Sequence, residues 1–150
     1  MYNKILNAKE PVSPQEMLDL MTTMKAEFAE FLPEGVTADD YIKIVAPQIT
    51  SPWTQYFIRY DPASALEKVK CPVLAVNGTK DLQVPPKENL GAISAALKKG
   101  GNKKVTVKEY PNLNHLFQEC TTGSPNEYAN IEQTFSPDVL KDLADWIIKQ

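Results

Sequence analysis

The chain has 150 residues, which is enough for one globular domain with a sizeable hydrophobic core. Its formal net charge of −3 arises from acidic and basic residues that are interleaved along the sequence. Because no basic block is present, nucleic acid and anionic membranes are not expected as partners, and no apolar run has the length of a membrane helix.

The cysteine and histidine content argues against a metal site. Two cysteines, Cys71 and Cys120, are too few for a disulfide framework and too isolated for a zinc site, so we expect buried free thiols. With one histidine in the chain, no metal and no cofactor are expected. The first residues lack the apolar core of a signal peptide, and since translation could begin upstream, a cytoplasmic or a periplasmic location stays open.

The first third of the chain is predicted to be helical. A capping box at Ser13–Glu16, with proline at the first helical position, begins a helix that should stop at Pro33–Gly35. Apolar side chains recur at the helical period and share one face, namely Met17, Leu20, Met21, Met24, Phe28, Phe31 and Leu32.

Two further helices are predicted before residue 62. Thr37 caps one that should end before Pro47, and Ser51 begins another. The latter helix carries the aromatic residues Trp53, Tyr56, Phe57 and Tyr60. The methionines and aromatic side chains of these helices could form a core, or they could form a lid whose apolar face is turned towards a ligand.

The pattern changes after residue 69. Val73–Val76 is a short apolar run that ends at Asn77 and Gly78, which is typical of a strand buried on both faces of a parallel sheet. A helix should follow Pro85 and end at the glycines 100 and 101, with Leu90, Ile93 and Leu97 on one face. Residues 104–110 alternate between polar and apolar, so they predict a strand near a sheet edge.

The C-terminal part is predicted to complete an α/β unit. Residues 119–136 should form a long surface loop, and a last helix should follow Ser136 with Leu140, Leu143, Ala144 and Ile147 on one side. The order strand, helix, strand, helix indicates a right-handed crossover unit. Since two strands do not make a stable sheet, we expect the free edge of Val73–Val76 to be covered by further strands, a second copy or a partner.

Two side chains follow the ends of the predicted strands. Asp81 comes after the first strand, and His115, the single histidine, comes after the second. Because the carboxyl ends of parallel strands lie at the same rim, the two side chains should meet there. A carboxylate that accepts the imidazole Nδ1–H would hold the ring as a general base, as in a Ser-His-Asp triad. Taken singly, an aspartate in a turn and a lone histidine are more often structural.

Residues 69–118 resemble the C-terminal half of an α/β-hydrolase. Val76–Pro85 is similar to the segment that carries the triad acid in that family, and Asn112–Phe117 to the loop that carries the triad histidine. The resemblance implies that Asp81 is the acid and His115 the base, in the chain order of this fold. It also implies a helical cap or lid over 1–62 and the C-terminal part of the hydrolase core over 63–150.

The nucleophile of such a triad has no counterpart here, because no Gly-x-Ser-x-Gly sequence occurs. We therefore expect the C-terminal part of a serine hydrolase whose parent acts on small carboxylic esters, and we expect the chain alone to be inactive. Substrate-binding residues are not indicated. The alternative is a non-catalytic module that dimerises or binds a partner. If the chain folds by itself, a homodimer is expected, with exchange of helices as one route.

Overall fold

The structure, a computed structural model, describes residues 1–29, 32 and 35–150, without the side chains of residues 28 and 29. It divides into two units, Met1–Asp61 and Pro62–Gln150. The interpretation of the first unit as a cap and of the second as a hydrolase core stays a prediction. Phe31 and the expected helix stop at Pro33 lie outside the described residues.

The first unit is built of short helices around a small core. The helices are α1 (Tyr2–Asn7), α2 (Pro14–Thr23), α3 (Lys25–Ala29), α4 (Ala38–Ile49) and α5 (Pro52–Arg59). The capping box of α2 is confirmed, since Ser13 Oγ accepts a hydrogen bond from the Glu16 N–H and Glu16 Oε2 accepts one from the Ser13 N–H. The core consists of Ile5, Val12, Met17, Met21, Ile42, Ala46 and Ile49.

Helix α4 corrects one prediction, because it continues through Pro47 to Ile49 instead of ending before the proline. A proline in a helix removes one N–H donor, and its ring crowds the preceding turn. Here only two residues follow it, and the Thr50 N–H donates to the Ala46 carbonyl at 3.2 Å, which closes the last turn. Ile49 is buried in the core, and this burial favours the extra turn.

The methionines and the aromatic residues of this unit lie in different environments. Met17 and Met21 are fully buried, so they belong to the core. The aromatic side chains of α5 and of its C-terminal cap are 46–70% exposed in the structure, namely Trp53, Tyr56, Phe57 and Tyr60. The polar side of α5 is held to the segment before α2 by the buried Gln55 side chain. Its Oε1 accepts a hydrogen bond from the Val12 N–H, and its amide donates one to the Val12 carbonyl.

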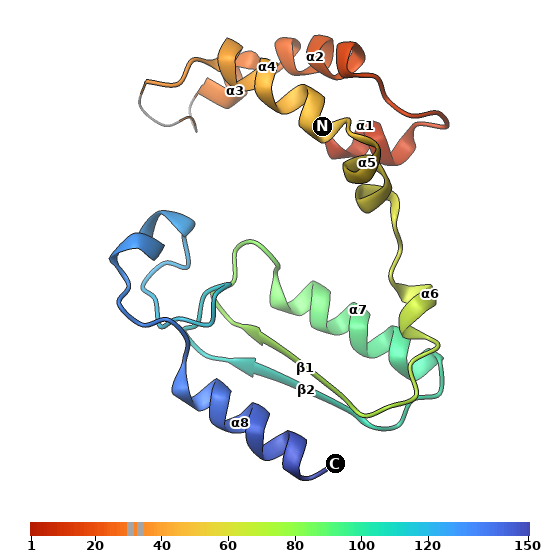
Figure 1. The fold of residues 1–150 in the computed structure, drawn as a ribbon, viewed down its shortest axis with the longest axis vertical. Helices are drawn as coiled ribbons and strands as arrows, with labels where there is room; N and C mark the ends of the chain where they lie inside the picture. Colours follow the sequence, from red (N-terminus) through yellow and green to blue (C-terminus); the bar gives the residue numbers. More distant parts are fainter. Residues whose placement is uncertain (30–31, 33–34) are drawn as a thin grey trace. The chain divides into compact units, whose positions relative to one another are not determined.

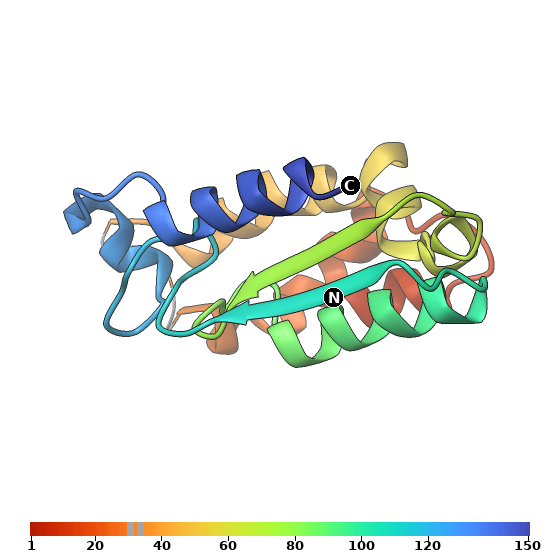
Figure 2. The ribbon, with the colours of Figure 1, turned by 90° about the horizontal axis from the view of Figure 1, so that it is seen from below.

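The second unit contains a parallel two-stranded sheet between helices. Its elements are α6 (Ala63–Leu66), β1 (Val73–Gly78), α7 (Pro86–Lys99), β2 (Val105–Tyr110), the 3-10 helix η1 (Pro125–Asn130) and α8 (Pro137–Ile148). The strands pair in parallel from Val73 with Val105 to Gly78 with Tyr110. Figures 1 and 2 show α7 on one face of the sheet and α8 on the other. The predicted strand–helix–strand–helix order is thereby confirmed.

Helix α8 presents a different face to the sheet than its sequence indicates. Val139 is fully buried and Leu143 packs beside it, whereas Leu140 is 53% and Ile147 65% exposed. Polar contacts select this rotation, because Asp142 accepts a hydrogen bond from the Tyr110 hydroxyl and forms an ion pair with Lys108. The expected apolar side of the helix is therefore only partly used.

The expectation of buried thiols is wrong for Cys71, which is exposed, while Cys120 is half-buried. Cys71 lies before the start of β1, and its carbonyl accepts a hydrogen bond from the Asn102 side chain at 2.9 Å. Among the residues that the structure describes, none of the helices combines the length and apolarity needed to cross a bilayer.

Candidate active site

Asp81 lies in the loop after β1 and is nearly buried, with 5% of its surface exposed. Its Oδ1 accepts hydrogen bonds from the N–H groups of Gln83 and Val84, at 2.9 and 2.8 Å. Two backbone donors on one oxygen hold the carboxylate in a single orientation. The other oxygen, Oδ2, is thereby left to face the neighbouring loop.

His115 lies in the loop after β2, and its Nδ1 is 2.9 Å from Asp81 Oδ2. The contact expected between the two side chains is therefore present. The aspartate side chain is 4% exposed and the imidazole 39%, so the carboxylate is buried and the imidazole lies on the outer side of the pair. With Nδ1 donating to the carboxylate, Nε2 is the ring nitrogen that remains to accept a proton.

Backbone contacts hold the two loops together beyond the ends of the strands. The Thr79 N–H donates to the Tyr110 carbonyl at 2.8 Å, and the Lys80 N–H donates to the Leu113 carbonyl at 3.0 Å. Gly78 is needed at this crossing, since a Cβ there would lie 2.2 Å from the Leu113 carbonyl oxygen. The distance between acid and imidazole is thus set by main chain rather than by flexible side chains.

The loop that carries His115 is organised by Asn114, a fully buried polar residue that sequence reasoning missed. Its Oδ1 accepts hydrogen bonds from the N–H groups of Leu116 and Gln118, at 2.9 and 3.0 Å, and its amide donates to Gln118 Oε1. Asparagine bonding to the N–H two residues ahead is a common turn. That local pattern is a signal in the sequence, but the burial of Asn114 is not.

A second set of contacts joins the His115 loop to the start of α8. The Gln118 side chain donates to the Gln133 carbonyl at 2.8 Å, and the Ser136 N–H donates to the Phe117 carbonyl at 2.8 Å. The Phe117 ring packs edge-on against Tyr110, with 6.3 Å between the ring centroids. The loop is therefore attached to both β2 and α8.

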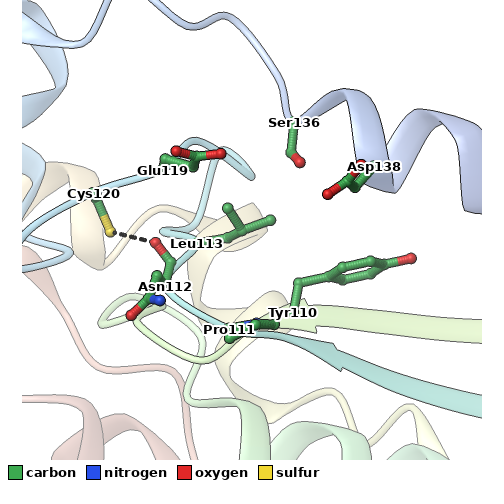
Figure 3. Close-up of a pocket in the computed structure, with 8 residues that line it drawn as sticks. All are labelled: Tyr110, Pro111, Asn112, Leu113, Glu119, Cys120, Ser136 and Asp138. Atoms are coloured by element: carbon green, nitrogen blue, oxygen red, sulfur yellow. Dashed lines mark hydrogen bonds between the residues drawn. The ribbon is translucent and has the colours of Figure 1, made fainter.

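A pocket of about 490 Å³ lies beside the end of β2, and Figure 3 shows the residues that line it. They are Tyr110, Pro111, Asn112, Leu113, Glu119, Cys120, Ser136 and Asp138. Cys120 Sγ lies 3.3 Å from the Asn112 carbonyl oxygen, and burial, followed by the charge of Glu127, raises the pKa of this thiol. Neither Asp81 nor His115 lines the pocket, so it is separate from the acid–imidazole pair.

The serines occupy helices or helix caps. Ser13, Ser51, Ser124 and Ser136 are N-caps, Ser64 lies in α6 and Ser94 in α7. None of these positions is a turn from a strand into a helix, which is where a hydrolase nucleophile lies. In the described ranges, no group of three acidic, cysteine or histidine side chains is arranged to hold a metal ion.

The parallel strands, the crossover helix and the rim position of the loops are those of a partial α/β-hydrolase fold, as the sequence resemblance implies. The family model of the prolyl oligopeptidase family matches residues 16–142, and the chain belongs to this family. The serine hydrolase expectation is thus confirmed at the level of the family. The family is one of peptidases by name, and the expected ester specificity has no support from it.

The chain is similar to the acylamino-acid-releasing enzyme of Arabidopsis thaliana, with 42% identity over 66 residues. The aligned region is 44% of this chain and only 8% of that enzyme, so the chain spans a small part of its relative's length. No solved structure matches the chain.

Proposed function

We propose that this chain supplies the acid and the base of a serine hydrolase, with Asp81 as the triad acid and His115 as the general base. The observation that carries the proposal is the 2.9 Å contact between His115 Nδ1 and a buried Asp81 oxygen, at the rim where parallel strands end. A carboxylate in this position fixes the imidazole tautomer and stabilises the imidazolium that forms during proton transfer.

The reaction needs a serine on a turn from a strand into a helix, a position that none of the six serines of this chain occupies. In the complete hydrolase, that serine oxygen attacks the substrate carbonyl while His115 Nε2 takes its proton. His115 then gives the proton to the leaving group, which departs and leaves an acyl-enzyme. Water then attacks the acyl-enzyme while His115 takes its proton, and His115 returns that proton to the serine oxygen as the acid product leaves.

The substrate that we propose is a peptide bond, in particular one in a short peptide with an acylated N-terminus. The family name and the name of the Arabidopsis relative support this class over the small ester expected from the sequence. Ester and amide hydrolysis use the same triad, so the acid and the base do not decide between them. The shape of the substrate pocket determines whether an ester or an amide is preferred, and a parallel assay of both substrates distinguishes the two specificities.

The test joins the 150 residues to the coding sequence that precedes them and measures hydrolysis of an N-acetyl-peptide anilide beside p-nitrophenyl butyrate. We expect Asp81→Asn to lower kcat by about 10⁴-fold, because an amide turned towards Nδ1 imposes the wrong tautomer. His115→Ala should lower kcat by at least the same factor. Asp138→Asn, an exposed carboxylate at the same end of the sheet, is the control and should leave kcat unchanged. Undiminished turnover by His115→Ala would exclude the base role.

A non-catalytic role in dimerisation or partner binding is the second candidate. It is favoured by the serines, which lie in helices and helix caps rather than on a turn from a strand into a helix. In that case, the protein extended upstream would hydrolyse neither substrate, and His115→Ala would leave its binding behaviour unchanged.

A further inference from the structure

The outer edge of β2 borders a groove of about 430 Å³ that none of the catalytic groups uses. Lys87, Leu90, Gly91, Ser94 and Lys98 of α7 line one wall, and Val105, Val107 and Glu109 of β2 line the other. Val107 is 42% exposed although it is apolar, and a Cβ added at Gly91 would meet no atom within 4 Å. The middle of the groove is therefore open and apolar.

The backbone of β2 offers unpaired groups along this groove. The N–H groups of Val73 and Thr79 donate to the carbonyls of Lys104 and Tyr110, so the even-numbered residues of β2 bond to β1. Alternation along a strand then turns the N–H and C=O groups of Val105, Val107 and Glu109 to the open side. In the part of the chain that the structure describes, the sheet has only these two strands.

We propose that a second copy of this chain occupies the groove, with the two β2 strands antiparallel about a twofold axis at Val107. In this register Val107 pairs with the partner's Val107, and Val105 pairs with the partner's Glu109. All three are residues whose backbone groups face outwards, so each pair forms hydrogen bonds in both directions. A slip by one residue would oppose outward-facing groups to inward-facing ones and lose these bonds.

Charge complementarity is the argument for a second copy over an unrelated strand. Because α7 runs antiparallel to β2 and leads into its start, Lys98 lies beside Val105 at one end of the groove. The partner's Glu109 pairs with Val105 and so comes to Lys98, and the twofold axis repeats this ion pair. On the other face of the sheet Lys108 meets the partner's Thr106, so no like charges are directly opposed.

This interface differs from the cover expected for the edge of β1, which lies on the opposite side of the sheet. It also leaves the rim of Asp81 and His115 free, since the groove is lined by the length of β2 and α7. Formation of this dimer therefore does not depend on the hydrolase chemistry.

Cysteine cross-linking tests the register. A hydrogen-bonded antiparallel pair has Cα atoms about 5.5 Å apart, within the range of a disulfide. In the full chain with Cys71→Ser and Cys120→Ser, we expect Val107→Cys to form a covalent dimer under mild oxidation. The matched control is Thr106→Cys on the same strand, which meets Lys108 rather than itself and should cross-link at least tenfold more slowly. Equal cross-linking of the two variants, or none at Val107→Cys, would overturn the register.

Exchanging the charges of Lys98 and Glu109 tests whether the two copies pair through these residues. Light scattering and sedimentation measure the dimer. Wild type should have twice the 16.8 kDa mass of one chain. Lys98→Glu and Glu109→Lys should each raise the dimer dissociation constant by about tenfold, because each alters both ion pairs. The double variant should restore the wild-type value. A monomeric wild type at high micromolar concentration, or a dimer unaffected by Val107→Asp, would refute the interface.

Discussion

At the scale of single residues, backbone donors rather than other side chains orient the acid and the loop that carries the imidazole. Asp81 uses one oxygen for two backbone N–H groups, and Asn114 does the same one residue before His115. A buried oxygen that satisfies two donors is costly to remove, since both N–H groups then lose their partner. The precision of the Asp81–His115 contact therefore depends on residues outside the pair itself.

Asn114→Ala should lower the free energy of unfolding by about 2–4 kcal/mol, because it leaves the buried Gln118 N–H and the partly buried Leu116 N–H without their acceptor. Chemical denaturation of the 150-residue chain measures this. Asn112→Gly is the matched control in the same loop, and it should be neutral because Asn112 is exposed and has φ of 61°, which glycine adopts readily. Similar losses for the two variants would argue against a special role for Asn114.

At the scale of elements, the contact between β2 and α8 is polar as well as apolar. Burial, and after it the hydrogen bond to Asp142, raises the pKa of Tyr110 to about 12. The ion pair with Lys108, and after it the Tyr110 hydroxyl, lowers the pKa of Asp142. These groups fix the rotation of α8 that the apolar pattern alone does not predict.

The raised pKa of Tyr110 predicts a loss of stability at alkaline pH. Between pH 10 and about 12 the unfolded chain releases the phenolic proton while the folded chain keeps it, so the free energy of unfolding should fall as the pH rises. Below pH 10 this contribution is fully present. Tyr110→Phe should show a shallower fall over the same interval in alkaline denaturation curves. An identical slope in wild type and variant would contradict the assignment.

The crossing of β1 with the His115 loop predicts a strong effect of a single methyl group. Gly78→Ala places its Cβ 2.2 Å from a carbonyl oxygen of Leu113 and should cost about 3 kcal/mol or more, since backbone cannot give way as a side chain does. Gly91→Ala in α7 is the control. A Cβ at position 91 would meet open space, so Gly91→Ala should raise the free energy of unfolding by up to about 1 kcal/mol. The measurement is made at a chain concentration low enough to avoid dimer formation through the groove that Gly91 lines.

At the scale of the whole molecule, two hydrophobic clusters without a common residue stabilise two units of the chain. One contains Met17 and Met21 within Met1–Asp61, and the other contains Tyr110 and Val139 within Pro62–Gln150. Each unit therefore has its own source of stability. The role of the first unit as a cap stays a prediction.

Met17→Ala should cost the first unit about 2–5 kcal/mol, because it leaves a cavity in a core of few residues. Hydrogen exchange should then accelerate in α2 and α4, whose contact Met17 supports. Met24→Ala is the control, since this methionine is half-buried and is not part of the cluster, so its effect should be smaller. Unchanged exchange in α4 with Met17→Ala would show that the cluster is not the source of its stability.

Local signals in the sequence were sufficient for the strand–helix–strand–helix order of the second unit, but not for α1, α6 and η1, and not for the break between α2 and α3. Helix caps at Ser13 and Thr37 and the apolar run at Val73 depend on neighbours a few residues away, and the structure confirms each. Where a local rule met a tertiary contact, the contact prevailed: helix α4 passes Pro47 because Ile49 is buried in the core, and α8 turns Val139 inwards because Asp142 is held by β2.

From its sequence alone, this chain reveals an α/β unit of a serine hydrolase with an acid and a histidine at one rim, since residue type, strand pattern and chain order are local properties. Tertiary structure decided that His115 and Asp81 meet at 2.9 Å, that Asn114 is buried within the His115 loop and that β2 has an open edge beside α7. Those features join residues that are distant along the chain, and no periodicity within one element specifies such contacts.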